Sequence, residues 1–373
     1  MAPTGPRSAD DWLGVAERVA RQHLAPHSEE MDRTDQLPAS IRDGLASSGL
    51  MGLTTPPEFG GAGADARTVA RILETLAVAS GAVATILSVH LSVATGPIVD
   101  HGSEEQKRTL LPNMASGRWL GAFALSEPSV GSDAARLSTR YRPTEEGFRL
   151  RGNKMFTTSA ESADVLVLFA TRDPDQGARG ISAFAVTKGT PGLSIGQRLD
   201  KLGIRGSETV ELVLEDALLP RSALLGAEGG GFPIAMQALA GGRIGIAACA
   251  LGVARAAFNA MRAAARKDPA DWKRAAVAHA YSELEAAAAL VERAAAMRDQ
   301  GAPFVDAASA AKLFASQAAV HIAYAGVDVA GPAGVVKGAV AERLLRDARV
   351  FPIVEGTTEI QELILGRDLL GQD

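Results

Sequence analysis

One glutamate near the C-terminus, Glu355, stands in a sequence context suited to proton abstraction. It lies in the segment Val-Phe-Pro-Ile-Val-Glu-Gly-Thr-Thr, in which Pro352 prevents the preceding helix from continuing, and Thr358 and Gln361 are spaced as in a capping box that opens the next helix. We therefore expect Glu355 on a connector among apolar residues, where partial desolvation raises a pKa towards the range useful to a general base. Taken alone, however, the pattern is more typical of an exposed carboxylate near a helix N-terminus, whose dipole lowers the pKa.

Two earlier segments combine hydroxyl groups with a backbone that a ligand can approach closely. The first, residues 123–133, leaves an expected strand for a tight loop, in which Gly131 permits close approach and the hydroxyls of Ser126 and Ser132 could bind ring carbonyls or phosphate oxygens. The second, residues 154–159, ends a strand with an aromatic and two hydroxyl side chains, which could support the face and edge of a flat heterocycle. Taken alone, the first favours a capped turn and the second an ordinary strand end.

The histidines compete with Glu355 for the role of base but lack a suitable context. His90 lies in an apolar helical stretch, His101 at its end, and His279 and His321 within expected helices, without partners at metal-ligand spacing. We expect each to be structural. The sequence contains no G-x-S-x-G elbow, P-loop or H-E-x-x-H motif, so hydrolase, nucleotidase and zinc-protease activities have no support.

The composition is that of a folded protein with a sizeable core. The chain has 373 residues, of which 47% are hydrophobic and 22% charged. A formal net charge of -5 and a pI near 5.8 provide no basic field for a nucleic-acid backbone. The only cysteine, Cys249, excludes a disulfide framework, and neither a long uninterrupted apolar run nor a signal-peptide pattern occurs. We therefore expect a cytoplasmic protein that binds neither nucleic acid nor membrane.

The elements that must position these residues fall into three consecutive blocks. Apolar residues at three- and four-residue spacing predict helices in the first block at residues 12–24, 41–50, 69–78 and 82–100. Short apolar runs between turn residues predict strands at 121–125, 148–150, 165–171, 181–186 and 210–214. Helical spacing then returns at 232–265, 272–298 and 307–329. Segregated helices and strands predict an α+β fold, divided into an N-terminal helical domain at 1–119, a central β domain at 120–227 and a C-terminal helical bundle at 228–373.

Taken together and in this order, these segments resemble the acyl-CoA dehydrogenase family over about residues 12–370. Further segments that carry the resemblance are P-E-F-G-G from Pro57, G-S-E-E-Q-K from Gly102, D-K-L-G-I-R-G-S from Asp200, G-R-I-G-I-A from Gly242 and R-D-A-R from Arg346. The resemblance implies the family's fold, in which N-terminal helices, a central β-barrel-like domain and a C-terminal four-helix bundle follow one another. FAD then lies between the β domain and the bundle.

The resemblance also assigns roles to individual positions. Glu355 falls on the family's catalytic base, and Ser132, Arg243 and Gly356 join it at positions that contact substrate. Some branches carry the base just before Arg243, but here that residue is Gly242, which leaves Glu355 as the candidate. The positions that match FAD contacts are Phe123, Leu125, Ser126, Gly131, Ser132, Phe156, Thr157, Thr158, Gly331, Gly356, Thr357 and Thr358.

The activity implied by the resemblance is the dehydrogenation of an acyl-CoA thioester to the trans-2-enoyl-CoA. Glu355 would take the α proton, the flavin would accept the β hydride, and an electron-transfer flavoprotein would receive the electrons. The base's own N–H and a flavin hydroxyl would stabilise the enolate oxygen. Residues 80–92 and 236–251 look most like the short-chain, butyryl-CoA branch, whose role is in fatty acid metabolism. A homotetramer or homodimer is implied.

Departures from the family pattern keep other functions open. Where the family has an Arg-x-x-Phe-Gly loop that reaches the FAD of a neighbouring subunit, this chain has the shorter R-K-D-P-A-D-W from Arg266. Asp328 replaces a glutamine near Gly331, and Ala240 replaces an acidic residue before Gly242. The alternatives are a flavin oxidase or monooxygenase, a dehydrogenase of carrier-protein thioesters, and an FAD-poor structural subunit.

Overall fold

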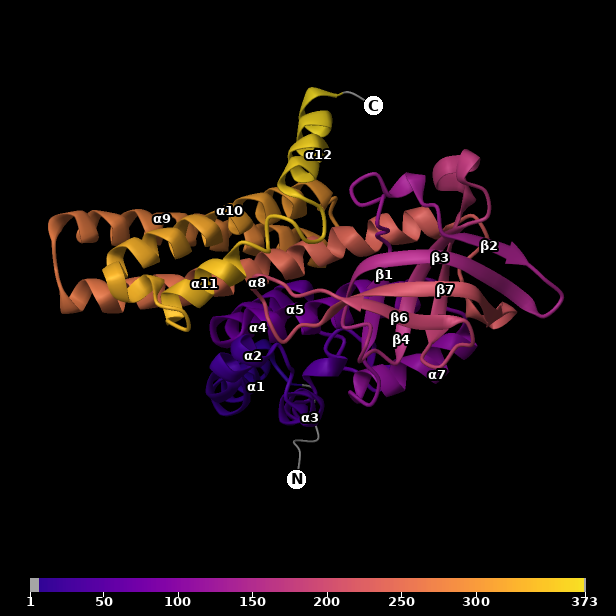
Figure 1. Cartoon of the computed structure of the whole chain (residues 1–373), viewed down its shortest axis with the longest axis horizontal. Helices are drawn as coiled ribbons and strands as arrows, with labels where there is room; N and C mark the ends of the chain where they lie inside the picture. Colours follow the sequence, from indigo (N-terminus) through magenta and orange to yellow (C-terminus); the bar gives the residue numbers. More distant parts are fainter. Residues whose placement is uncertain (1–6, 372–373) are drawn as a thin grey trace.

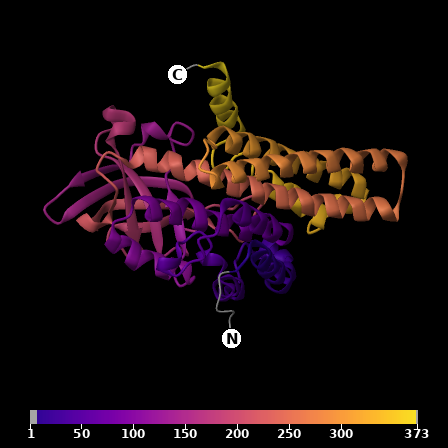
Figure 2. The ribbon, with the colours of Figure 1, turned by 180° about the vertical axis from the view of Figure 1, so that it is seen from behind.

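The three blocks form three adjoining regions. The computed structural model describes residues 7–371. A sheet region and a long helical bundle lie end to end, and the N-terminal helices pack beneath their junction (Figure 1). The view from behind shows the same arrangement, with the last helix projecting from the body (Figure 2). The predicted α+β fold with segregated elements is confirmed.

The N-terminal region consists of short helices, two of which begin at capping boxes. The Ser8 hydroxyl accepts the Asp11 N–H while the Asp11 carboxylate accepts the Ser8 N–H, and Ser103 and Gln106 form the same pair before the last helix of the region. The helix predicted at 82–100 contains a π-helical segment, His90–Ala94. The helices are α1 (Ala9–Val19), α2 (Ser28–Thr34), α3 (Ala39–Ser48), α4 (Ala66–Ala79), α5 (Gly81–Val89), α6 (Thr95–His101) and α7 (Glu104–Ala115).

The central region is one mixed sheet. The pairing runs β6-β7-β3-β2-β4-β5-β8, and β1 pairs in parallel with β4. The strands are β1 (Gly121–Ala124), β2 (Arg140–Pro143), β3 (Gly147–Thr158), β4 (Val165–Thr171), β5 (Ile181–Thr187), β6 (Leu193–Arg198), β7 (Thr209–Pro220) and β8 (Leu224–Leu225). Every residue of β4 is buried, because one face meets the apolar core of the sheet region and the other meets side chains of α6, α7 and α8. Such a strand reads as a continuous apolar run, which is why its bounds were predicted correctly.

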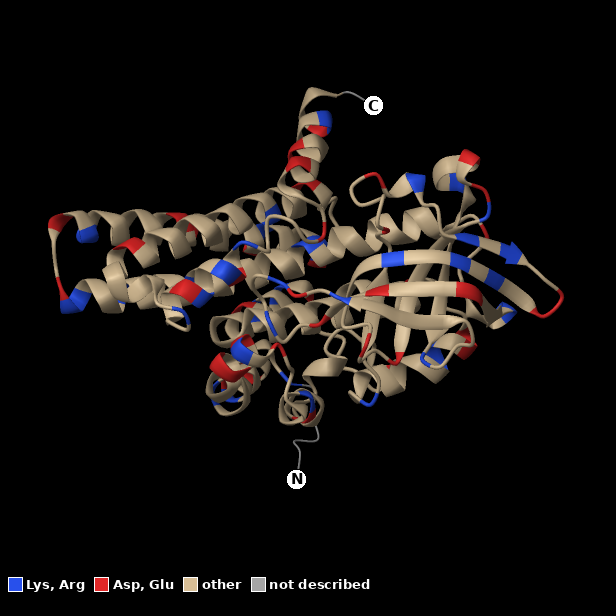
Figure 3. Ribbon diagram, viewed as in Figure 1, with Lys and Arg blue, Asp and Glu red and all other residues tan. Residues whose placement is uncertain are grey.

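The C-terminal region is built on α8, a helix of 37 residues that crosses the molecule. Its middle is a run of buried small residues, so neighbouring helices pack close to its backbone. In Figure 3 this stretch carries almost no charge, whereas charged residues gather at the outer end of the bundle. The helices are α8 (Gly231–Lys267), α9 (Asp271–Asp299), α10 (Val305–Ala330), α11 (Val340–Ala348) and α12 (Thr358–Leu370).

Three helical segments are long and apolar enough to cross a membrane by length and composition alone. Two of them lie largely inside the protein, since 83% of the apolar window in Gly81–His101 and 78% of that in Gly231–Lys267 are buried. The third, Val305–Val335, is 44% buried. Packing between helices therefore accounts for the apolar character of the first two.

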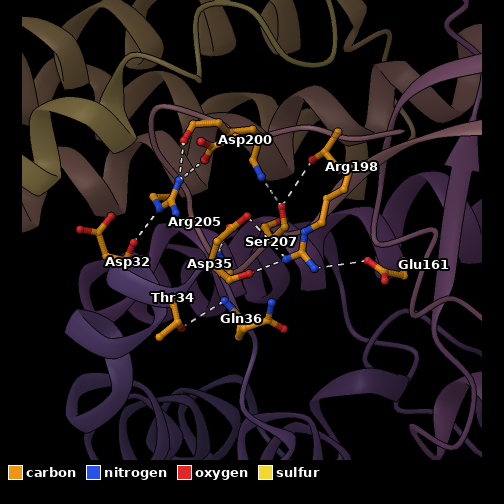
Figure 4. Close-up of polar contacts among 12 residues, drawn as sticks. Asp32, Thr34, Asp35, Gln36, Glu161, Arg198, Asp200, Arg205 and Ser207 are labelled. Atoms are coloured by element: carbon orange, nitrogen blue, oxygen red, sulfur yellow. Dashed lines mark hydrogen bonds and ion pairs between the residues drawn. The ribbon is translucent and has the colours of Figure 1, made fainter. Parts of the chain in front are cut away.

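A polar network joins the loop between β6 and β7 to the N-terminal helices (Figure 4). Arg205 Nε donates to the Asp32 carbonyl oxygen at 2.6 Å, and the Gly206 N–H donates to the Asp35 carboxylate at 2.7 Å. Arg198, at the end of β6, donates to the Asp35 carbonyl oxygen and pairs with the Asp35 carboxylate. The loop is therefore fixed to the end of α2.

The same loop also holds α11, the helix that precedes Glu355. The Ile204 N–H donates to the buried Asp347 carboxylate at 2.6 Å, and a Cβ added to Gly203 would lie 2.1 Å from the Arg346 carbonyl oxygen. Arg346 pairs with Asp32 at 2.6 Å. All three regions therefore meet directly before the Glu355 connector.

Candidate active site

Glu355 lies on the connector between α11 and α12, as predicted. Its backbone and that of Gly356 are left-handed, with φ of 51° and 98°. A non-glycine residue in this conformation costs about 1–2 kcal/mol, so surrounding contacts must hold it. Two of these contacts meet at one atom, because Lys312 Nζ and Gln361 Nε2 both donate to the Gly356 carbonyl oxygen, at 2.6 and 3.0 Å.

The capping box predicted at Thr358 is wrong by one residue. The N-cap of α12 is Thr357, whose hydroxyl accepts the Ile360 N–H. Thr358 instead donates its N–H to the Pro352 carbonyl oxygen at 2.9 Å. Gln361 is buried and turns towards Gly356, so it is not available to cap the helix.

The carboxylate of Glu355 is buried and close to α8. The residue as a whole is half-buried, but both carboxylate oxygens are buried and accept no hydrogen bond from residues 7–371. A Cβ added to Gly242 would lie 2.1 Å from Glu355 Oε2, so the carboxylate rests against the glycine backbone. Burial raises the pKa of Glu355, the charges of Arg243 and Lys312 oppose this, and the pKa becomes about 7. At neutral pH the group is poised between base and acid.

Arg243 follows Gly242 on α8 and is buried beside this carboxylate. Its exposed fraction is 6%, and its Nε finds no acceptor within the described residues. Burial lowers the pKa of Arg243, and the charge of Glu355 opposes that effect. A guanidinium stays charged in proteins, so Arg243 supplies a positive charge near the base.

An apolar cluster connects the base to the first hydroxyl-bearing segment. Val89, Val93 and Ala238 form this cluster, against which Phe123 and Leu239 pack. Val93 Cγ1 would lie 3.0 Å from a Cβ at Gly242. The structure therefore brings Phe123 to the surroundings of Glu355, although the two residues are far apart in the sequence.

The two hydroxyl-bearing segments lie side by side. The Met155 N–H donates to the Ser126 carbonyl oxygen at 2.8 Å, and the buried Lys154 ammonium donates to the carbonyl oxygen of Leu125 at 3.1 Å. Lys154 also pairs with the buried Glu127 carboxylate at 2.8 Å. Glu127 in turn accepts hydrogen bonds from the backbone N–H groups of residues 138 and 139. Burial alone raises the pKa of Glu127, but Lys154 and these donors lower it to about 2.

The end of β3 carries an exposed aromatic ring and one buried hydroxyl that has no partner among the described residues. A register shift between Lys154 and Thr157 places Phe156 at φ 57°, with 63% of the residue exposed. The Thr157 hydroxyl is buried and has no partner among residues 7–371, and Thr158 is half-buried. Leu125 is buried beside half-buried Ser126. Apolar faces with free polar groups at their edge fit a flat heterocycle such as the flavin of FAD.

Gly131, Ser132 and Gly331 make no contact with Glu355 among the interactions of residues 7–371. Gly131 and Ser132 are on an exposed loop, where a Cβ added to Gly131 would meet no atom within 4 Å. Gly331 caps the C-terminal end of α10 with φ 64°. At about 1.5 Å per residue it stands about 28 Å along the helix from Lys312, which contacts the base turn. A single chain therefore does not bring Gly331 to Glu355.

His90 has the structural role that the sequence predicts. The Gly121 N–H donates to its Nδ1 at 3.0 Å, so Nε2 carries the proton and donates to the Met51 carbonyl oxygen at 3.1 Å. Burial lowers the pKa of His90 to about 4, although hydrogen bonds to backbone oxygens oppose this. A neutral histidine with both nitrogens occupied is not available as a base.

Sequence reasoning missed three buried charges: Glu127, Lys154 and Lys312. For Lys312 there was a signal, because it falls on the apolar face of its helix together with Ala308, Ala311 and Ala315. For Glu127 and Lys154 there was none, since their pairing depends on the packing of the loop after β1 against β3, which the sequence does not show.

Comparison with known proteins points to one family over nearly the whole chain. Sequence models of the acyl-CoA dehydrogenase N-terminal, middle and C-terminal domains match residues 9–118, 122–217 and 229–370. The human mitochondrial short-chain specific acyl-CoA dehydrogenase is 40% identical over 376 residues, which cover 98% of this chain and 90% of that protein.

Two solved structures extend the similarity to the whole fold. Butyryl-CoA dehydrogenase from Megasphaera elsdenii is 35% identical with a TM-score of 0.95, over 99% of this chain and 100% of that chain. A chain from work on the electron transferring flavoprotein of Acidaminococcus fermentans is 35% identical with a TM-score of 0.96, over 100% of both. The chain therefore belongs to the acyl-CoA dehydrogenase family of flavoprotein oxidoreductases.

Proposed function

We propose that this protein is an FAD-dependent dehydrogenase of short-chain acyl-CoA thioesters, with Glu355 as the catalytic base. The observation that carries the proposal is the buried Glu355 carboxylate, which has no hydrogen-bond partner among residues 7–371 and lies near the apolar cluster against which Phe123 of the predicted flavin-binding segment packs. A carboxylate in such surroundings takes a proton more readily than one in water. The two segments of the sheet region and the Glu355 turn supply the surfaces that the reaction needs.

The chain's own residues would remove the α proton and stabilise the charge that develops. Glu355, with a pKa of about 7, is matched to proton abstraction at neutral pH. No oxygen of residues 7–371 accepts the Glu355 N–H, so this donor is free for the thioester oxygen as it becomes an enolate. Bound FAD supplies the acceptor for the hydride from the β carbon. The dry apolar cluster strengthens these electrostatic contacts.

FAD would be held by the edges of β1 and β3 and by the Glu355 turn. The proposed contacts are Phe123, Leu125, Ser126, Gly131, Ser132, Phe156, Thr157, Thr158, Gly356, Thr357 and Thr358. Gly331 would reach the FAD of another copy, because it lies at the far end of α10 within one chain. This supports a homotetramer or homodimer.

The substrate and partners follow from the same site. Ser132, Arg243 and Gly356 would contact the acyl-CoA thioester beside Glu355. Short chains are favoured by Val93, which lies next to Gly242 and packs with Val89, and by the short-chain and butyryl-CoA names of the relatives. An electron-transfer flavoprotein is the proposed electron acceptor, and the cytoplasm the proposed location.

An anaerobic titration tests the function. The purified protein should be yellow, and butyryl-CoA should bleach it; Glu355→Gln should keep the colour but not bleach. Glu362→Gln serves as the control, because Glu362 is an exposed carboxylate on the neighbouring helix. Bleaching by Glu355→Gln at the wild-type rate would reject Glu355 as the base.

The same preparation separates the alternatives. Fast reoxidation in air with release of peroxide would favour a flavin oxidase, and a colourless protein that does not take up FAD would favour a structural subunit. A turnover series in which C12 thioesters exceed C4 thioesters would reject the short-chain assignment.

A further inference from the structure

Lys312 is a buried cation without a carboxylate partner. Its side chain on α10 is fully buried, and no carboxylate within residues 7–371 lies within salt-bridge distance of it. The Nζ atom donates to one oxygen, the Gly356 carbonyl, at 2.6 Å. Burying an ammonium against a single neutral acceptor is unfavourable for folding, so stability does not explain this residue.

The carbonyl that Lys312 holds belongs to the turn that aims the base. Glu355 and Gly356 are both left-handed, and the Gly356 oxygen is also held by Gln361 at 3.0 Å. The direction of this carbonyl fixes the peptide plane between Gly356 and Thr357, one residue beyond Glu355. Releasing it would let Glu355 relax to an ordinary backbone conformation and leave its place against Gly242.

Charges from two helices act on the Glu355 carboxylate. Arg243 of α8 and Lys312 of α10 both favour its ionised form, while burial favours the protonated form. Cys249, also on α8, is buried and its pKa is raised, so it stays a neutral thiol. Glu359 acts on Lys312 from α12 together with Glu355. Burial lowers the pKa of Lys312 to about 8, which leaves it mostly charged at neutral pH.

We propose that Lys312 is a positioning residue for the base: its ammonium holds the Gly356 carbonyl, and with it the left-handed turn that keeps the Glu355 carboxylate against Gly242. Through the same position its charge favours the ionised, reactive form of Glu355. This inference rests on the proposed function, in which Glu355 removes the α proton. The proposed role explains why a charged lysine is buried at this position although its burial lowers the stability of the fold.

The first test replaces Lys312 by methionine in the FAD-loaded protein. Methionine keeps the volume but removes the charge and the donor, so the melting temperature should stay the same or rise while kcat with butyryl-CoA falls about tenfold or more. The acid limb of the kcat/KM profile should move to higher pH, because the ionised carboxylate loses a favourable charge. A residue with a merely structural role would lower the melting temperature and leave the limb in place.

A matched variant separates charge from hydrogen bonding. Gln361→Met removes a neutral donor to the same Gly356 oxygen, so kcat should fall by a smaller factor and the acid limb should not move. A direct readout comes from protein labelled with 13C at glutamate carboxyl carbons, in which the Glu355 signal is assigned by its absence from Glu355→Gln. This signal should titrate at higher pH in Lys312→Met than in the wild type, independently of turnover.

The outcomes distinguish this inference from the proposed function. If Glu355→Gln is inactive but Lys312→Met keeps the wild-type kcat, acid limb and carboxyl titration, Lys312 has no positioning role and only this inference is overturned. If Lys312→Met loses activity with an unmoved carboxyl titration and a lower melting temperature, the role is structural and the inference is again overturned. If Glu355→Gln is fully active, the proposed function itself fails.

Discussion

The Glu355 carboxylate occupies the space that a side chain at position 242 would fill. An added Cβ on Gly242 would lie 2.1 Å from Glu355 Oε2 and 3.0 Å from Val93 Cγ1. The Glu355 carboxylate and a side chain at position 242 therefore could not both be accommodated. The absence of a side chain at Gly242 is what allows the Glu355 carboxylate, the proposed base, to lie against α8.

Gly242→Ala should consequently displace the base. The methyl group overlaps the carboxylate, so kcat/KM for butyryl-CoA should fall at least about tenfold while FAD stays bound, since misplacement of a reacting group by about 1 Å costs about 100-fold. Gly366→Ala is the control, because Gly366 also lies in a helix but a Cβ there would meet no atom within 4 Å. That control should keep wild-type activity. Full activity in Gly242→Ala would show that the carboxylate does not act from this position.

The pH dependence of turnover should report the raised pKa of Glu355. Burial raises this pKa to about 7 against the opposing charges of Arg243 and Lys312, and only the ionised carboxylate accepts a proton. The kcat/KM value for butyryl-CoA should therefore rise between about pH 6 and 8 and level off above that range. An acid limb near the ordinary glutamate value of 4.5 would contradict a buried base.

Phe156 should matter for FAD but not for the fold. Phe156 is 63% exposed in the protein without FAD, so truncating its side chain removes little buried surface. Phe156→Ala should weaken FAD affinity several-fold, measured by flavin fluorescence during dilution, and leave the melting temperature of the FAD-free protein unchanged. Ile195→Ala, at an exposed position of β6, is the control and should affect neither property. Undiminished FAD retention in Phe156→Ala would remove Phe156 from the flavin site.

The Lys154–Glu127 pair should dominate the stability of the loop before Gly131. Lys154→Met leaves a buried carboxylate unpaired, which should lower the free energy of unfolding by about 3–5 kcal/mol at pH 7. Lys337→Met, at an exposed lysine, should leave it unchanged. Denaturant titrations provide the measurement.

The sign of the pH effect on this pair follows from the Glu127 pKa. Because that pKa is about 2 when folded and near 4.5 when free, the pair's stabilisation is present above pH 4.5 and is lost as the pH falls towards 2. In Lys154→Met, Glu127 stays buried but loses the ammonium, so its folded-state pKa should rise above 4.5. The unpaired Glu127 carboxylate should then destabilise the fold at neutral pH, and the free energy of unfolding of this variant should increase as the pH falls and Glu127 takes up a proton. The same direction of pH dependence in both proteins would argue against the pair.

Much of the fold follows from patterns that the sequence carries locally. The apolar run at residues 165–171 predicted strand β4 correctly, and the helical spacing at residues 232–265 predicted helix α8. Both patterns are clear because these elements are largely buried and contain few polar residues. Strands β2, β6 and β8 were missed: β6 is largely exposed and β8 has two residues, so neither shows alternation. The domain division at residues 119 and 227 stays a prediction.

The site was predictable in part. The connector position of Glu355 followed from Pro352, whereas the roles of Lys312 and Gln361 arise from contacts that bridge α10, α12 and the turn. Such contacts depend on how helices pack, which residue spacing within one helix does not encode. The misplaced N-cap at Thr358 has the same origin, because the buried environment of Gln361 decides which threonine caps the helix.

The glycine face of α8 has a consequence for how this enzyme could change its substrate range. A Cβ at Gly245 would lie 2.4 Å from Ser88 Oγ, and one at Gly252 would lie 2.4 Å from the Glu74 carbonyl oxygen. At these two positions the α8 backbone therefore lies close to its neighbours, which are the Ser88 side chain of α5 and the main chain of α4. If the proposed acyl site extends along this face, accepting a longer chain would require α4 or α5 to shift relative to α8, so we expect changes in chain-length preference to come from how these helices pack.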